Sequence, residues 1–173
     1  MSDQENQYTN PPLKRHAALQ PFSRDHQAGL VCARHLTRAA DKDADARRRA
    51  AREFAEAWSE HIAEHFDDEE RLLLPLMNDA DRARMTDEHA DLRARAEQAR
   101  AHAGDPDPGA DPGADWTRTT GRALHDHIRW EERTLFPAIE HTATGEALAL
   151  LKSHTDEIEA ARPRNACRPN DEA

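Results

Sequence analysis

The chain has 173 residues and a formal net charge of −10, which fits one domain with one sizeable core and argues against nucleic-acid binding. No apolar run approaches the roughly 20 residues that span a bilayer, and the polar start shows no signal-peptide pattern, so neither membrane insertion nor secretion is expected. Charged residues make up 34%, aromatic residues 5%, and glycine occurs 6 times, a composition that predicts an all-α fold.

Residues 1–20 are polar, contain Pro11-Pro12 and show no sustained apolar period, so they are predicted to form a mobile N-terminal arm. Apolar residues then recur in steps of three and four, which predicts a first helix from about residue 21 to residue 40. His26 falls on the inward stripe of this helix. His35 lies half a revolution away and is expected to face solvent.

A long second helix is predicted to follow a short connection over residues 41–45 and to run to about Met77. Its inward stripe alternates steps of four and three, as a bundle helix requires. The stripe consists of Phe54, Trp58, His61, His65, Glu69, Leu72 and Leu76. Three successive members are polar, and burying them without partners would cost several kcal/mol. The stripe therefore predicts a partner such as a metal ion.

The second half of the chain repeats this plan. A third helix over about residues 80–103 has His89 as the only polar member of its inward stripe, and an exposed, partly mobile linker rich in proline and acid is predicted over residues 105–113. A fourth helix, from residue 115 or 116 to about residue 141, places His127 and Glu131 inward.

The remaining residues are predicted to lie outside the bundle. Leucine and isoleucine at helical spacing predict a short fifth helix over residues 146–161, and two prolines interrupt a polar tail over residues 162–173. The predicted organisation is thus an arm, a four-helix bundle, a short helix within 143–161 and a tail, with the bundle over residues 21–142.

One motif occurs twice in these helices. His65 stands four residues before Glu69, and His127 stands four residues before Glu131; in both copies a second glutamate follows and an apolar pair closed by proline ends the motif. Positions four apart share one face of a helix, so each copy presents an imidazole beside a carboxylate. An acid–histidine pair, Asp25-His26 or Glu88-His89, precedes each copy at nearly the same distance. The repeat predicts two helical hairpins related by a pseudo-two-fold axis.

Six inward side chains from four helices are predicted to converge on one metal site. Nitrogen and oxygen donors without thiolate favour iron, manganese or zinc, and carboxylate bridging inside a four-helix bundle favours two iron ions. The predicted ligands are His26, His65, Glu69, His89, His127 and Glu131.

Other polar residues near the motif are assigned different roles. His61 is a possible additional ligand, otherwise a group that lines the cavity. Glu70 and Glu132 point about 100° away from the glutamates before them and are interpreted as surface charges or as acceptors behind the ligands. His125 falls off the inward stripe, and His154 is interpreted as structural.

At these residues the sequence resembles the hemerythrin-like, HHE cation-binding family, over about residues 20–142. The resemblance rests on His26, the Glu88-His89 pair and the two His-x-x-x-Glu-Glu runs that end in Leu74-Pro75 and Phe136-Pro137. It implies an up-and-down four-helix bundle with a non-haem di-iron site. It also implies binding of dioxygen or related diatomics, iron or redox sensing, or iron handling.

The chain departs from the oxygen-carrying members of that family at two places. Those members have a second histidine one turn after the third-helix ligand, where this chain has Arg93, and a longer spacing from histidine to an aspartate on the last helix. Fewer protein ligands leave more open metal positions. Open positions favour peroxide, nitric oxide or redox chemistry over reversible oxygenation.

Three functions follow as hypotheses. The favoured one is a di-iron protein that binds or senses dioxygen, nitric oxide or peroxide, or handles iron. The second is an enzyme that turns over peroxide or a nitrogen oxide at the same centre, using His61 or an open iron position. The third is a structural or interaction bundle that holds zinc or no metal. The two cysteines belong to no Cys-x-x-Cys pair, which favours reduced thiols and a cytoplasmic location; protein partners are not indicated.

Overall fold

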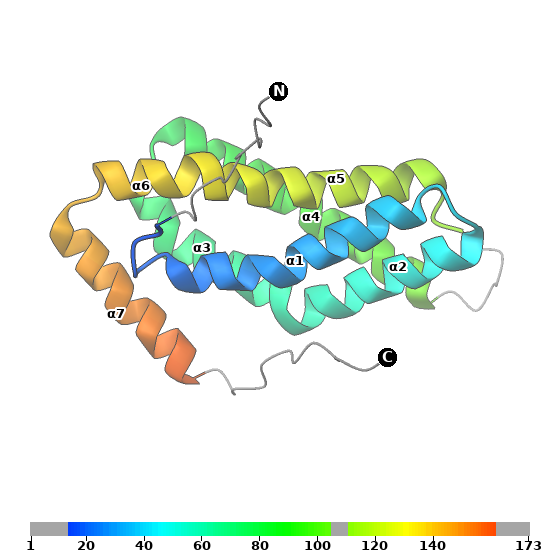
Figure 1. Cartoon of the computed structure of the whole chain (residues 1–173), viewed down its shortest axis with the longest axis horizontal. Coiled ribbons are helices and arrows are strands. Elements are labelled where there is room, and N and C mark those ends of the chain that lie inside the picture. The colour runs from blue at the N-terminus through cyan, green and yellow to red at the C-terminus, as the bar shows by residue number, and fades with distance from the viewer. Residues whose placement is uncertain (1–13, 105–110, 162–173) are drawn as a thin grey trace, which may run out of the picture.

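A computed structural model describes residues 14–104 and 111–161, and every regular element in these ranges is a helix, as predicted (Figure 1). Most of the predicted arm, the centre of the linker and the predicted tail lie outside the described residues, at 1–13, 105–110 and 162–173. The elements are α1 (Gln20–Ala39), α2 (Ala44–Ala57), η1 (Trp58–Ile62), α3 (Ala63–Leu73), η2 (Leu74–Leu76), α4 (Asp79–Gly104), α5 (Ala114–Trp130), η3 (Glu131–Leu135), α6 (Phe136–Thr142) and α7 (Gly145–Ala161).

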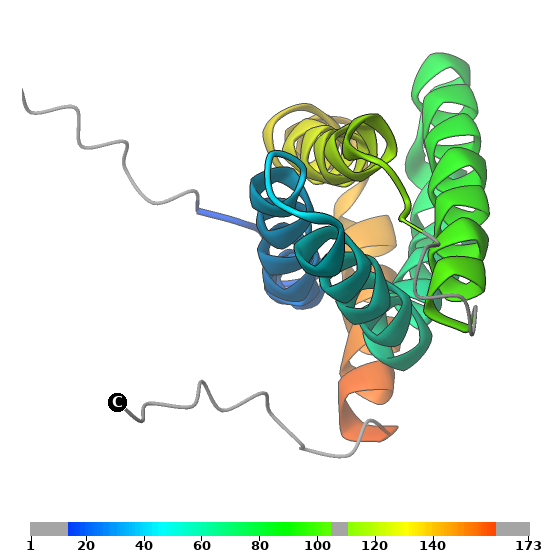
Figure 2. The same cartoon turned by 90° about the vertical axis from the view of Figure 1, so that its right-hand side faces the viewer.

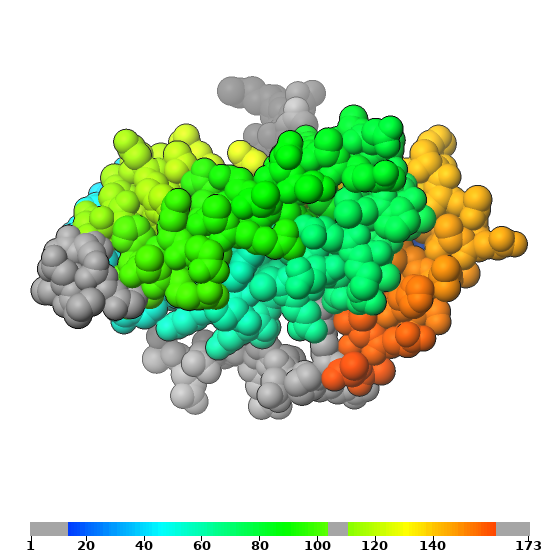
Figure 3. All heavy atoms as spheres, turned by 180° about the vertical axis from the view of Figure 1, so that it is seen from behind, coloured from blue at the N-terminus to red at the C-terminus, as the bar shows by residue number. Residues whose placement is uncertain are grey.

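The elements form four helical paths that run up and down the bundle. The first path is α1, the second joins α2, η1, α3 and η2 end to end, the third is α4, and the fourth joins α5, η3 and α6. Figure 2 looks along the bundle and shows these paths around a common axis. From behind, α4 runs across the bundle and α7 packs across one end (Figure 3). The predicted four-helix bundle with a fifth C-terminal helix is therefore confirmed.

Local sequence signals set several helix starts. The Asp43 carboxylate accepts a hydrogen bond from the Ala46 N–H at 2.8 Å, and the Asn78 side chain accepts one from the Asp81 N–H at 2.9 Å. These side chains satisfy amide groups that have no partner within the first turn. Gly113, just before α5, has φ of 85°, a conformation that glycine adopts without a Cβ clash.

Apolar residues pack in two clusters, one toward each end of the bundle. The first contains Phe54, Trp58 and Phe66 with residues of α1, α4 and α5. The second contains Phe22, Phe136 and residues of α4 and α7. Along each of the four paths, the buried polar residues stand between members of the two clusters. The centre of the molecule is thus polar, and both ends are apolar.

The predicted N-terminal arm is wrong over its last residues. Ala18 and Leu19 are fully buried in the second apolar cluster, and the Arg15 side chain is only 6% exposed. Arg15 hydrogen-bonds Glu132, and its guanidinium lies 5.0 Å above the Phe136 ring. The prediction failed because these contacts join residues more than a hundred positions apart, which a local apolar period does not register.

The inward stripe of the second path also differs from its prediction after Trp58. Ile62 is buried where His61 was expected, and Leu73 and Met77 are buried where Leu72 and Leu76 were expected. The cause at the first position is η1, a π-helical turn in which the Ala63 N–H donates to the Trp58 carbonyl, five residues back. This extra residue in the turn shifts the phase between the parts of the helix on either side.

No helix among the described residues is long and apolar enough to cross a membrane.

Candidate metal centre

The structure brings all six predicted ligands together in the polar centre of the bundle. None is more than 5% exposed, although each is a charged or titratable side chain. Groups of this kind are rarely buried without a partner of opposite charge or a metal. They come from five elements: His26 on α1, His65 and Glu69 on α3, His89 on α4, His127 on α5, and Glu131 at the start of η3.

Each of the two buried carboxylates directs its two oxygens at different histidines. Glu69 Oε1 lies 3.1 Å from His65 Nε2 and 3.4 Å from His26 Nε2, whereas its Oε2 lies 3.6 Å from His89 Nε2. Glu131 Oε2 lies 3.1 Å from His26 Nε2, whereas its Oε1 lies 3.4 Å from His127 Nε2. The six side chains therefore divide into two donor sets that share Glu69, and Glu131 of the second set also faces His26 of the first.

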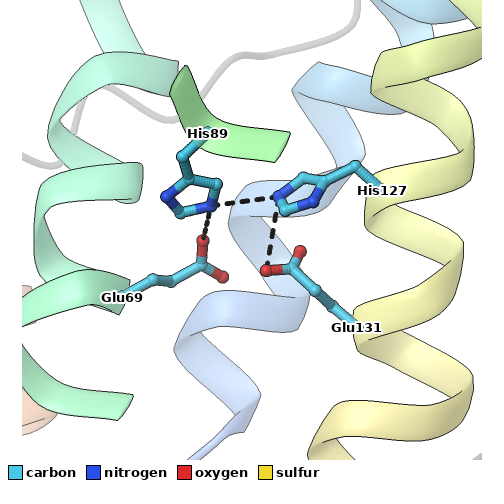
Figure 4. Close-up of side chains that lie close together, drawn as sticks. All are labelled: Glu69, His89, His127 and Glu131. Carbon is cyan, nitrogen blue, oxygen red and sulfur yellow. Dashed lines mark hydrogen bonds and ion pairs between the residues drawn. The ribbon is translucent and has the colours of Figure 1, made fainter. Parts of the chain in front are cut away.

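The second donor set is drawn in Figure 4, where Glu69, His89, His127 and Glu131 point toward one another from three helical paths. Candidate ligand atoms in this set lie within 4.8 Å of one another, and the same holds for the set of His26, His65 and Glu69. Three or four nitrogen and oxygen donors at such spacing are typical of a site for a transition metal ion.

Most of the inward-facing polar atoms have no hydrogen-bond partner. Both oxygens of Glu69 and of Glu131 are buried and unpaired, as are His26 Nε2 and both ring nitrogens of His65. Unpaired buried polar atoms cost free energy. The presence of several such atoms in one place therefore calls for a group that satisfies all of them. A pair of cations shared by the two carboxylates fits this donor set, because every orphaned oxygen then has a positive partner.

His89 and His127 support the same conclusion. Their Nε2 atoms lie 3.1 Å apart, and each ring is fixed from behind by a carboxylate at Nδ1, Glu70 for His89 and Glu88 for His127, both at 2.8 Å. An ionised carboxylate only accepts, so both Nδ1 atoms donate and, in neutral rings, both Nε2 lone pairs face each other. A cation between them removes this repulsion.

The carboxylates behind the histidines follow the internal repeat. Glu132 Oε1 lies 2.7 Å from His26 Nδ1, as Glu70 lies behind His89. Asp25 Oδ2 lies 3.7 Å from His65 Nδ1, as Glu88 lies behind His127, though more distantly. Each acid is next in sequence to a ligand candidate on its own helix, yet it faces a histidine on another helix. Such carboxylates orient metal-binding imidazoles and make them stronger donors.

Arginines hold three of these outer carboxylates. Arg15 donates to Glu132 Oε2 at 2.8 Å, Arg93 donates to Glu70 Oε1 at 2.7 Å, and Arg84 donates to Glu88 Oε1 at 2.7 Å. Arg93, which replaces the second third-helix histidine of oxygen carriers, thus supports a ligand candidate from behind and is 37% exposed. Sequence reasoning left Glu70 and Glu132 between two roles, and the structure places both behind histidines.

Burial and the neighbouring carboxylates have opposite effects on the pKa values of His65 and His26. Burial disfavours the imidazolium of His65, but the charge of Glu69 and close contacts with Asp25 and Glu69 outweigh it and raise the pKa of His65 to about 9. The pKa of His26 is raised in the same way, against burial, by Glu131, Glu132 and Glu69.

The pKa values of Glu69 and Glu132, which face these histidines, shift in the opposite direction. Although burial favours the neutral acid, the charge of His65 and contacts with His26 hold the pKa of Glu69 well below its ordinary value. Contacts with His26, Ser23 and Arg15 overcome the effect of burial on Glu132 and lower its pKa to about 2. Without metal, His26 and His65 therefore retain protons, while Glu69 and Glu132 retain negative charge.

Aromatic rings wall the centre. Phe66, which follows His65 in the motif, stacks on the His89 ring with centroids 3.8 Å apart, and Phe136 stacks on His26 at 5.6 Å. Phe22 packs against both His65 and Phe136. These rings restrict the imidazole orientations and separate the centre from bulk water.

His61, given above as a possible additional ligand or otherwise a group that lines the cavity, lies outside the centre. Its side chain is 61% exposed and lies nearest to Glu60, because η1 turns Ile62 inward in its place. His35 and His125 are exposed, as expected, and pair with Glu53 and Asp126. His154 is half-buried on α7 and belongs to neither donor set.

A family model described as the hemerythrin HHE cation binding domain matches residues 17–139, which include all six ligand candidates. The chain belongs to the hemerythrin HHE family. The match covers the four paths of the bundle up to α6, whereas α7 lies beyond it. No curated protein and no solved structure matches the chain. The HHE domain and the buried histidines and glutamates together identify a cation-binding bundle.

Proposed function

We propose that this HHE protein holds two iron ions bridged by Glu69 and Glu131, and that it binds or senses dioxygen, nitric oxide or peroxide, or handles iron. One observation carries the proposal: each carboxylate directs its two oxygens at different histidine pairs. A carboxylate that spans two ions inside a four-helix bundle is typical of di-iron proteins. Manganese and zinc accept the same donor types and are the alternatives.

The residues of the chain would fix the two ions and leave room for a ligand. His26 and His65 would hold one ion, His89 and His127 the other, and Glu69 and Glu131 would be shared between the two. A diatomic or peroxide would bind at metal positions that the protein leaves open. When bound, iron supplies Lewis acidity and one-electron redox chemistry. The carboxylates behind the imidazoles keep the proton on Nδ1 and leave Nε2 free to bind metal.

Metal analysis with an absorption spectrum of aerobically purified protein tests the proposal. The expected result is two iron ions per chain and near-ultraviolet ligand-to-metal bands, which zinc does not give. Replacing His65 or His127 with alanine should remove most of the iron, whereas alanine at the exposed His35 should not. Full iron occupancy in both ligand variants, or zinc as the bound metal, would contradict the proposal.

The bridging role has its own test. Glutamine at position 69 keeps the size of the side chain but offers one weaker oxygen and an NH₂ group in place of two equivalent oxygens. The Glu69→Gln variant should lose one iron or the magnetic coupling between the two. An unaltered coupled pair in its Mössbauer spectrum would show that Glu69 does not bridge.

We also propose a cytoplasmic location, because the centre would be loaded where iron is reduced and thiols stay free. Cys32 is a free thiol. Burial, with a smaller effect from Glu53, raises its pKa to about 11, so the group is a neutral thiol at physiological pH. Cell fractionation with an antibody to the chain would test this location.

A further inference from the structure

A basic groove lies between α1 and α5, two helices that are labelled in Figure 1. Its volume is about 560 Å³, and its walls carry Arg34 and Arg38 from α1 and Arg122 and Arg129 from α5. All four arginines are exposed. This concentration of positive charge is unexpected on a chain whose formal net charge is −10. The groove is separate from the donor sets of the metal centre.

The four arginines differ from most others on the surface in lacking carboxylate partners. Arg47 pairs with Asp111 and Arg118 pairs with Asp41, as many other arginines of the described chain pair with acids. Within residues 14–104 and 111–161, none of the four groove arginines makes such a pair. Among the residues that line the groove, His125 has an acidic partner, Asp126, at 2.9 Å. Unpaired arginines that share one concavity form a surface for anions.

The shape of the groove favours an extended ligand over a single anion. Arg34 and Arg38 are one helical turn apart, about 6 Å, and Arg122 and Arg129 are two turns apart, about 10 Å. Leu30, Val31 and the buried Ala33 also line the groove between these charges. An isolated phosphate would engage one end of the groove and leave its apolar part uncovered.

The groove is a fixed feature because α1 and α5 touch beneath it. A Cβ at Gly121 would lie 2.7 Å from the carbonyl oxygen of Ala33 and 2.6 Å from Thr37 Oγ1. Such close approach of two helices sets the separation of the arginine rows. Preformed sites lose less entropy when they bind.

We propose that the α1–α5 groove docks an acidic segment of a partner protein, with at least two carboxylates for the arginines and an apolar side chain for the groove between them. Arginine and carboxylate pair through two parallel hydrogen bonds, which gives the groove its selectivity. A nucleic acid fits less well, because the formal net charge of the chain is −10 and a long phosphate backbone would extend beyond the four arginines of the groove.

A short fluorescein-labelled peptide of glutamate and leucine serves as the probe, with binding measured by fluorescence anisotropy. The double variant Arg34→Gln, Arg122→Gln should weaken binding about tenfold, since each exposed ion pair contributes up to ~1 kcal/mol. The matched control is Arg49→Gln, Arg52→Gln, which removes two exposed arginines of α2 outside the groove and should leave binding within about twofold. Added salt should weaken binding to the unaltered protein.

Circular dichroism and bound metal should be the same in all variants, and Arg38→Gln with Arg129→Gln provides a second groove pair if the first unfolds. Three results would overturn the proposal: no binding of the peptide, equal loss in groove and control variants, or displacement by inorganic polyphosphate that itself binds the groove more tightly than the peptide. Because the groove contains no metal ligand candidate, these results do not depend on which ion the centre holds.

Discussion

Glu132 connects the N-terminal segment to the metal centre through one carboxylate. It accepts from Arg15 through Oε2 and from His26 through Oε1. Glutamine at this position offers His26 a weaker acceptor or, if flipped, an N–H, so the imidazole loses orientation and basicity. We expect Glu132→Gln to lower metal affinity about 10- to 100-fold in a chelator competition titration.

The control for this variant is Glu53→Gln, which breaks the exposed pair between Glu53 and His35. It removes the same charge from a histidine partner far from the centre and should leave affinity unchanged. Equal affinities in the two variants would show that Glu132 does not act on the metal through His26.

The raised pKa of His65 predicts how the metal-free protein responds to pH. Its folded pKa of about 9 exceeds its ordinary value of 6.5, so its protonated form stabilises the fold below pH 6.5 and this stability is lost as pH rises through 9. The melting temperature of chelator-treated protein should therefore fall over that interval. Metal replaces these protons, so metal affinity should rise over the same interval. A melting temperature that stays constant or rises over this interval would contradict the raised pKa of His65.

At the scale of the helices, η1 sets the phase of the second path. It places both Trp58 and Ile62 in the core while leaving His61 and Glu60 exposed. η1 already contains one residue more than an α-helical turn, so inserting an alanine after Glu60 should rotate one side of the path by about 100° relative to the other. The Phe54–Trp58 side and the His65–Glu69 side then cannot face the core together.

We expect the variant with an alanine inserted after Glu60 to bind little metal and to melt without a sharp transition, whereas Glu60→Ala should behave as the unaltered protein does. Calorimetry and metal analysis of the two proteins provide the measurement. Normal metal content in the insertion variant would mean that the phase of η1 is not required.

Gly121 allows α1 and α5 to touch. An alanine there would place its Cβ 2.7 Å from the Ala33 carbonyl oxygen and 2.9 Å from the Thr37 amide nitrogen, which are backbone atoms that cannot rotate away. Gly121→Ala should therefore destabilise the fold by about 1–3 kcal/mol in urea unfolding.

Gly145 is the matched control for this change, because a Cβ there meets nothing within 4 Å. Gly145→Ala lies at the start of α7 and should stabilise slightly, by about 0.5 kcal/mol, since alanine restricts the unfolded chain. The close packing of α1 on α5 would be refuted if the two variants unfolded at the same urea concentration.

The periodic parts of the chain were predictable from sequence, and the long-range parts were not. The duplicated His-x-x-x-Glu and the acid–histidine pairs predicted which six side chains would meet, because helical spacing is a local property. η1 was missed because a π-helical turn has no sharp sequence signature, so His61 was placed on the wrong face. The role of Glu132 was left open because its partners, Arg15 and His26, belong to other segments. The acidic residue next to each ligand candidate in the sequence was the signal that could have indicated this role.

At the scale of the whole molecule, the metal centre and the fold stabilise each other. Without metal, the four oxygens of Glu69 and Glu131 are buried and unpaired, while both ends of the bundle keep their apolar clusters. Chelator-stripped protein should therefore remain helical. A metal that binds only the folded state adds about 4 kcal/mol at a thousandfold excess over its Kd.

For a chain of this size, that free energy corresponds to an increase in melting temperature of about 10 °C. Thermal melts of stripped and iron-reconstituted protein, followed by circular dichroism, provide the measurement. Reconstituting the His127→Ala variant supplies the control, because that protein should gain far less. Identical melting temperatures for stripped and reconstituted protein would show that the buried carboxylates are satisfied without metal.

Glu131 of the second helical hairpin faces His26 of the first, and Glu69 of the first faces His89 of the second. During synthesis, His26, His65 and Glu69 leave the ribosome long before Glu131 and Glu132, so the nascent first hairpin lacks both the Glu131 carboxylate and the support behind His26. The full set of six donors can therefore form only after the second hairpin has closed onto the first. We expect the finished bundle, rather than the nascent chain, to acquire the metal.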